Sequence, residues 1–143
     1  RPQSRLRRKA RHYAVQALYR WQLNGGDAAE IEAEFVAEYD FANTDREYFR
    51  ELLQGVTYHT PDIDAAYAGE LDRKLEELDQ VEVALLRMSV FELKDRLDVP
   101  YKVVINEAVD LAKKFGATDS HKYINGVLDR VARTLRAVEV KAG

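Results

Sequence analysis

Residues 79–93 read DQVEVALLRMSVFEL, and they give the strongest indication of how this chain folds. Its first four residues, Asp79 to Glu82, resemble an N-terminal capping arrangement, in which side chains satisfy the backbone N–H groups of a helix start. Apolar residues then leave little polar face around the helix: they are Val81, Val83, Ala84, Leu85, Leu86, Met88, Val90, Phe91 and Leu93. A helix that is apolar on nearly all sides is buried, so we predict a central helix wrapped by others.

Helical patterns precede this stretch. A first helix is predicted from about Ser4 to the Asn24-Gly25-Gly26 segment, where glycines provide the left-handed conformation that ends a helix. A second helix follows over residues 27–39. Residues 44–47 (Thr-Asp-Arg-Glu) have capping-box form at the start of a third helix, which we expect to stop before Pro61. A fourth helix is predicted to start around Asp62.

Two more helices follow the central one. After the turn at residues 98–100, apolar residues recur at i, i+4, i+7, i+8 and i+11 from Val104 to Phe115, and Gly116 closes this helix. The last helix starts at Asp119-Ser120, either of which can cap it, and continues to Leu135. The chain is therefore predicted to be all-α, with about seven helices in a compact bundle that forms one domain over residues 1–143.

Composition narrows the class of protein. The chain has 143 residues, of which 46% are hydrophobic and 33% charged, and it contains no cysteine. No apolar run approaches the roughly 20 residues of a membrane-spanning helix, and the basic N-terminus lacks the apolar stretch of a secretory signal. We therefore expect a soluble cytoplasmic protein.

Sequence motifs for catalysis and cofactor binding are missing. His12, His59 and His121 lack metal-ligand spacing, and Gly25-Gly26 belongs to neither a P-loop nor a dinucleotide fingerprint. The many carboxylates suit helix N-termini and solvated faces, so an acid/base pair cannot be chosen among them. We therefore expect that the protein is not an enzyme and that it binds neither a metal ion nor a cofactor.

Charge is distributed unevenly along the chain, although the net charge is only −3. Residues 1–26 carry seven Lys/Arg and no Asp/Glu, residues 27–98 carry seven against twenty, and residues 99–143 carry eight against five. A basic end can collect phosphates, whereas an acidic middle repels them, which suggests two surfaces with different partners. The alternative is a flexible basic tail.

The first helix has two faces when it is projected at 100° per residue. One face is apolar and should pack on the core: Leu6, Ala10, Tyr13, Ala14, Ala17, Leu18 and Trp21. The other is cationic in its first half and then presents an amide, a ring and an aliphatic chain: Arg5, Arg8, Lys9, Gln16, Tyr19 and Leu23. The first half suits a phosphate backbone and the second suits a protein or bases. Alternatively, another helix covers Tyr19 and Leu23.

Lys122 and Tyr123, near the start of the last helix, form a second candidate site. Bases of single-stranded RNA stack on aromatic rings while a neighbouring cation meets phosphate. The alternative is a tyrosine at the edge of the core, with its hydroxyl in water.

Five stretches together resemble one family, the NusB transcription antitermination proteins, in order along nearly the whole chain. They are RRKAR at 7–11 with AVQALYRW at 14–21, YF at 48–49 with GV at 55–56, LEEL at 75–78 with LR at 86–87, VPYKVVINEA at 99–108, and FGA at 115–117 with DSHKYINGVLD at 119–129. The resemblance implies two packed helical subdomains. It also implies binding of boxA RNA together with NusE, a ribosomal protein, in a complex in which RNA polymerase and other Nus factors resist termination, notably on ribosomal RNA operons.

The resemblance also assigns roles to residues. RNA contacts fall on Arg7, Arg8 and Arg11, with Lys122 and Tyr123 as a second contact, and the outer-face reading adds Gln16. Contacts to NusE fall on Tyr19, Glu76 and Glu82, and the outer face adds Leu23. Glu82 equally fits a capping role.

Two other functions are compatible with these residues. One is a helical protein-interaction module with a solubilising basic tail. The other is the NusB-like domain of a ribosomal RNA cytosine methyltransferase, although no glycine-rich cofactor domain follows Gly143 in this sequence. The sequence is compatible with a monomer and with a dimer of the free protein.

Overall fold

The computed structural model describes residues 2–143, which form eight α-helices and no strand. The helices are α1 (Pro2–Asn24), α2 (Ala28–Glu38), α3 (Arg46–Tyr58), α4 (Thr60–Ala68), α5 (Gln80–Asp95), α6 (Tyr101–Phe115), α7 (Ser120–Leu135) and α8 (Ala137–Ala142), with a short 3₁₀ helix, η1, at Leu75–Glu77. The predicted all-α class is confirmed. The seven predicted helices correspond to α1–α7, whereas α8 and η1 were not predicted.

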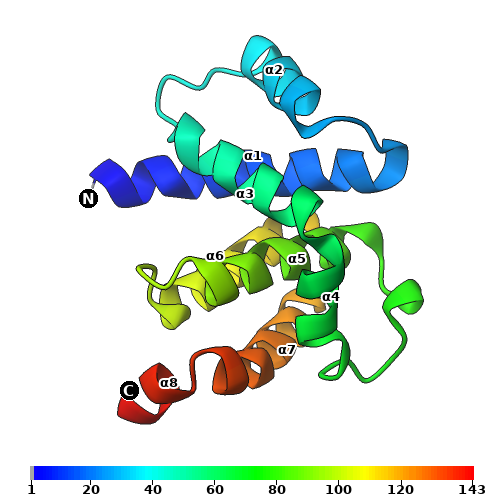
Figure 1. Cartoon of the computed structure of the whole chain (residues 1–143), viewed down its shortest axis with the longest axis vertical. Helices are drawn as coiled ribbons and strands as arrows, with labels where there is room; N and C mark the ends of the chain where they lie inside the picture. Colours follow the sequence, from blue (N-terminus) through cyan, green and yellow to red (C-terminus); the bar gives the residue numbers. More distant parts are fainter. Residues whose placement is uncertain (1) are drawn as a thin grey trace.

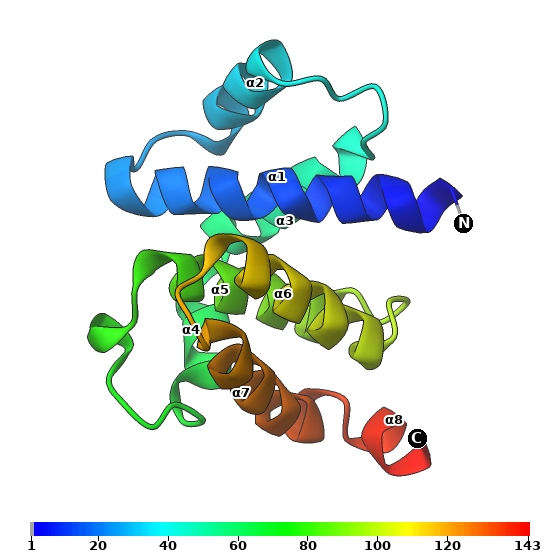
Figure 2. The ribbon, with the colours of Figure 1, turned by 180° about the vertical axis from the view of Figure 1, so that it is seen from behind.

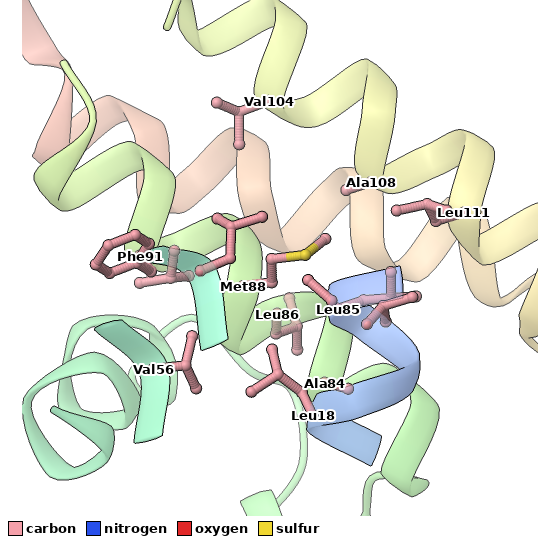
Figure 3. Close-up of a cluster of buried hydrophobic side chains, with 14 of the residues drawn as sticks. Leu18, Val56, Ala84, Leu85, Leu86, Met88, Phe91, Val104, Ala108 and Leu111 are labelled. Carbon is pink, nitrogen blue, oxygen red and sulfur yellow. The ribbon is translucent and has the colours of Figure 1, made fainter. Parts of the chain in front are cut away.

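The predicted central helix is α5. It packs against α1, α3, α4, α6 and α7, and every residue from Val83 to Leu86 and from Met88 to Leu93 is buried. Figure 3 shows its side chains between Leu18 of α1, Val56 of α3 and the Val104–Leu111 face of α6. The helix therefore forms the core around which the other helices assemble.

The helices form two groups (Figures 1 and 2). Helices α1, α2 and α3 lie together at one end, and α4 to α8 lie at the other, with α8 and the C-terminus farthest from α1. The groups meet where α1 and α3 pack on α5. At this junction Gly55 of α3 faces Phe91, and a Cβ atom at Gly55 would lie 2.2 Å from the Phe91 ring. Glycine is required here because it lets α3 approach α5 closely.

The observed helix ends can be compared with the capping residues and helix starts that the sequence predicts. Asp79 and Glu82 form the predicted capping box at the start of α5. At α3, however, the cap is Asp45, whose carboxylate accepts from the Tyr48 N–H, so the box predicted from Thr44 is wrong. Helix α4 starts at Thr60 rather than near Asp62, with Pro61 in its first turn, where proline's missing N–H costs nothing.

The start of α7 also differs from the prediction. Asp119 precedes the helix in the left-handed conformation, with φ of 67°, and its side chain caps no backbone N–H. At the end of α1, by contrast, Gly25 and Gly26 adopt the positive φ angles of 69° and 107° that the glycine pair predicted. Glycine takes such angles without the steric cost that a side chain adds.

The C-terminal segment is held by one buried arginine. Arg136 donates from Nε to the carbonyl of Leu93 at 2.7 Å, and from Nη2 to the carbonyls of Arg96 at 2.9 Å and Glu92 at 3.2 Å. These carbonyls lie at the C-terminal end of α5, where those of Glu92 and Arg96 also accept from the N–H groups of Arg96 and Val99, and where the last carbonyls of a helix lack the full set of partners within it. The helix dipole also stabilises a cation at this end of the helix. Arg136 therefore caps the core helix from the far end of the chain.

No helix in the described residues is long and apolar enough to cross a membrane.

Candidate nucleic-acid interface

A cleft of about 360 Å³ lies between the N-terminal half of α1 and the C-terminal half of α6. Its lining is mostly charged and comprises Arg5, Arg8, Lys9 and His12 of α1 with Glu107, Asp110, Leu111 and Lys114 of α6. The cationic half of the outer face of α1, predicted from the helical projection, is thus one wall of a cleft whose other wall is α6.

Arg8 connects the two walls. Its Nη2 atom lies 2.6 Å from Asp110 Oδ2 and its Nε atom 3.6 Å from Glu107 Oε1, while 59% of the arginine side chain stays exposed. The pair of Arg8 with Asp110 is exposed on both sides and contributes at most about 1 kcal/mol, so a phosphate can compete with Asp110 for Arg8 at little cost. Arg8 therefore presents a largely exposed guanidinium to the cleft.

Three further cations border the cleft. Within the described part of the chain, Arg5, Lys9 and Lys114 form no salt bridge with a carboxylate. The two acidic residues in the lining are both engaged by Arg8, and burial raises the pKa of Glu107, an effect that Arg11 and Arg8 oppose. The cleft therefore carries an excess of positive charge, which suits the phosphates of a nucleic acid.

Arg11 does not belong to this surface. Only 3% of the residue is exposed. Its Nη2 and Nε atoms donate to Glu92 Oε2 at 2.9 and 3.0 Å, and the Tyr48 hydroxyl donates to the same carboxylate. The sequence-based assignment of Arg11 to RNA therefore needs correction, because its guanidinium is a buried partner of α5. Sequence could not reveal this, since Glu92 lies 81 residues away.

Arg7 lies on another side of α1, facing α3. Its guanidinium lies 4.5 Å from the centre of the Tyr48 ring. It also lies within salt-bridge distance of Asp98 at 3.5 Å and Asp45 at 3.9 Å, with 21% of the side chain exposed. Its charge is thus balanced within the protein, and it is separate from the α1–α6 cleft.

An apolar groove of about 400 Å³ adjoins the charged cleft farther along α1. It is lined by Val15, Gln16, Tyr19, Arg20, Phe35, Glu38, Tyr39, Val81 and Phe115. The two hollows meet where the His12 and Phe115 rings lie 5.3 Å apart and where the Gln16 amide donates to the His12 carbonyl. The outer face of α1 therefore passes from a cationic wall, opposite α6, to an apolar one, opposite α2, over about one helical turn.

Tyr19 and Leu23 are 39% and 55% exposed, so the alternative that another helix covers them is wrong. Tyr19 lines the apolar groove, and Leu23 follows one turn later on α1. Large exposed apolar side chains beside a groove are typical of protein-binding surfaces.

The two acidic residues assigned to the partner differ in accessibility. Glu82 is 9% exposed; its carboxylate belongs to the α5 capping box and accepts from the Ser120 hydroxyl at 2.7 Å. Its capping role is thus the one that the structure supports. Glu76 is exposed in η1 and lines a separate hollow with Gln22 and Gln80.

Lys122 and Tyr123 lie at the start of α7. The Lys122 side chain is 73% exposed and lies 3.4 Å from Asp119. The Tyr123 ring is half-buried, with the Arg73 guanidinium 4.3 Å from its centre. Burial and the neighbouring Asp72 raise the pKa of the Tyr123 hydroxyl. A base that stacks on the face beneath Arg73 must therefore displace this guanidinium.

Sequence reasoning missed the α6 wall and Arg73. Glu107, Asp110 and Lys114 follow at i, i+3 and i+7, which places them on one stripe of a helix. That spacing was a usable signal, but it does not reveal which helix the stripe faces. Arg73 lies in the segment between α4 and η1, outside any periodic pattern, and offered no signal.

Comparisons with known proteins agree with this architecture. The NusB family model matches residues 8–133. The transcription antitermination protein NusB of Alcanivorax borkumensis is 58% identical over 133 residues, which cover 93% of this chain and 89% of the relative. Its name is that of a regulatory factor, in agreement with the expectation of a protein without enzymatic activity.

Solved structures give the same result. The NusB of T. maritima matches with a TM-score of 0.80 and 27% identity, covering 94% of this chain and 96% of that one. A chain from a crystal structure of antitermination factors NusB and NusE in complex with double-stranded RNA matches with a TM-score of 0.79 and 33% identity, covering 88% and 95%. Sequence, fold and order of the helices thus agree over most of the chain, which belongs to the NusB family.

Proposed function

We propose that this chain is a transcription antitermination factor that binds boxA RNA together with NusE in the cytoplasm. In this proposal the complex joins RNA polymerase and other Nus factors and resists termination, notably on ribosomal RNA operons. The whole chain, residues 1–143, acts as one RNA-binding domain. Support comes from the family membership and from the 33% identical relative that was crystallised with NusE and RNA.

One observation carries the proposal: a cationic cleft and an apolar groove adjoin on α1. Arg8, Lys9 and Lys114 offer charge to phosphates, whereas Tyr19 and Tyr39 offer exposed rings to a protein. Arginine and aromatic side chains of this kind are enriched in protein interfaces, and contacts of Lys and Arg with phosphates supply most of the nonspecific affinity for nucleic acid. An RNA and a protein can therefore bind side by side.

Lys122 and Tyr123 form the second RNA contact in this proposal, with Gln16 at the boundary of the cleft and groove. Arg7 stays a proposed RNA contact, at which a phosphate has to compete with Asp45 and Asp98 for the guanidinium. Leu23 extends the partner surface, and Glu76 offers an exposed carboxylate to a basic partner.

RNA titrations at several salt concentrations test the cleft. Lys9→Ala and Lys114→Ala should each weaken binding of boxA RNA and reduce the slope of log affinity against log salt by about 0.7–0.9, one phosphate contact each. Arg133→Ala is the matched control, because it removes an exposed charge from the last turn of α7, the helix that leads into α8 at the end farthest from α1. Equal slopes in all three variants would overturn the assignment of the cleft to RNA.

A substitution at Tyr19 separates the two partners. Tyr19→Asp places a charge in the apolar groove, so affinity for NusE should fall at least about thirtyfold, as for a buried interface residue. RNA binding by the isolated protein should change little, while the gain in RNA affinity on adding NusE should disappear. A folded Tyr19→Asp protein with normal NusE affinity would overturn the assignment of this groove to the partner protein.

A comparison of single-stranded and double-stranded RNA in the same titration shows which form the cleft binds more tightly.

A further inference from the structure

The imidazole of His12 lies in the charged cleft between the two helices. Its Nδ1 atom is 3.4 Å from Lys114 Nζ. The ring also contacts Tyr13 and Phe115, with centroids 5.2 and 5.3 Å away. It is half-buried, and its position is set by aromatic neighbours from both walls.

The contact with Lys114 defines the protonation state of His12. A lysine ammonium can only donate, so the imidazole accepts at this distance with an unprotonated Nδ1 atom. Burial lowers the pKa of His12, and the charges of Lys114 and Lys9 lower it further. In the free protein the ring is therefore neutral at pH 7, and a proton on Nδ1 would point at an ammonium.

Charged groups face His12 from both elements that form the cleft. From α1 these are Arg5, Arg8 and Lys9, and from α6 they are Glu107, Asp110 and Lys114. The two carboxylates pair with Arg8, and within the described residues His12 has no carboxylate partner. An anion that would stabilise the protonated ring must therefore come from outside the protein.

We propose that a phosphate group of the RNA binds between His12 and Lys114, and that His12 takes up a proton as the phosphate binds. The proposal rests on the proposed function. The proton comes from solvent and binds Nδ1, while the phosphodiester stays anionic and accepts from the imidazolium and the ammonium together. The phosphate thus replaces the single contact between the Lys114 ammonium and the neutral imidazole by two charge-assisted hydrogen bonds, and it offsets the repulsion that the protonated ring would otherwise meet from Lys114.

The direction of the pH effect follows from linkage. RNA raises the pKa of His12, so affinity is highest below the pKa of the free protein and falls as pH rises through the pKa of the complex. An opposite charge in contact shifts a pKa by about one unit or more, and each unit corresponds to a tenfold change in affinity across the transition. Between about pH 8 and about pH 6, affinity should therefore rise roughly three- to tenfold.

The experiment measures affinity for a boxA RNA oligonucleotide without terminal phosphates, which would titrate in the same range. Wild-type protein, His12→Asn and the matched control His59→Asn are compared at about pH 6 and about pH 8. His59 is exposed at the junction of α3 and α4 and does not line the cleft. His121→Asn, beside Lys122, tests the remaining histidine.

A rise in affinity at the lower pH that persists in His59→Asn and His121→Asn but is lost in His12→Asn supports the proposal. Equal affinity at both pH values, or loss of the rise in His121→Asn alone, would overturn the proton coupling and leave the proposed function intact. A wild-type protein that binds no RNA at either pH would overturn both. An NMR titration of the His12 ring in wild-type protein, free and RNA-bound, needs no variant. An unchanged pKa there also overturns the coupling.

Discussion

Replacing Arg11 with methionine separates the RNA role that sequence assigns to this residue from the role that its burial indicates. Methionine keeps most of the aliphatic stem but removes the guanidinium from Glu92, whose side chain is 1% exposed. Removing one partner of a buried ion pair costs about 3–5 kcal/mol, because the other charge stays desolvated. The Tyr48 hydroxyl still donates to this carboxylate, so we expect the lower half of that range.

Urea denaturation followed by circular dichroism measures this cost. We expect Arg11→Met to lower the free energy of unfolding by about 3–4 kcal/mol, a large part of the total stability of a domain of this size. The double variant Arg11→Met/Glu92→Gln should be more stable than Arg11→Met alone, because the amide leaves no buried charge and still accepts from Tyr48. This coupling identifies the pair as the source of the loss.

RNA binding by the same variant completes the test. At a temperature where Arg11→Met is folded, its salt slope should match that of wild type, since no phosphate contact has been removed. The reasoning fails if the variant unfolds at the wild-type urea concentration and its salt slope falls by about 0.7–0.9, because Arg11 would then be a phosphate ligand.

Three further changes probe packing, capping and stacking. Gly55→Ala should cost about 1–3 kcal/mol in urea denaturation because its Cβ would overlap the Phe91 ring, and wild-type stability would contradict the close approach of α3 and α5. Asp45→Ala should cost about 1 kcal/mol and Thr44→Ala much less, since only Asp45 accepts from a backbone N–H of α3; the reverse order would restore the box starting at Thr44. Tyr123→Ala should weaken RNA binding by about 1–3 kcal/mol while Tyr123→Phe stays near wild type, and equal losses in a binding titration would assign the effect to the hydroxyl instead of the ring.

The helices were predictable because their signals are local. The apolar pattern over residues 79–93 identified the core helix, and the Asp79–Glu82 pair gave its start correctly. Choosing between Thr44 and Asp45 was not possible, because both can cap and only the backbone angles decide. Helix α8 was missed because its six residues bury no side chain and therefore show no apolar stripe.

The part of the site that lies on one helix could be predicted, whereas contacts between different helices could not. The helical projection of α1 predicted correctly that Arg8, Tyr19 and Leu23 are exposed, because helical geometry fixes which residues share a face. It could not place Arg11, whose environment depends on a glutamate in α5. The projection also could not predict the contact between Lys114 and His12, because these residues lie 102 positions apart in the sequence.

The cationic cleft and the apolar groove share one unbroken helix, Pro2–Asn24, and this fixes their positions relative to each other. Each residue inserted or deleted between the two surfaces would rotate one of them by about 100° and turn core side chains towards water. Even four residues leave an error of about 40°, and the offset between the surfaces changes by about 6 Å. Substitutions can therefore adjust either surface by itself, whereas an insertion or deletion within this helix would change the spacing and the relative orientation of both.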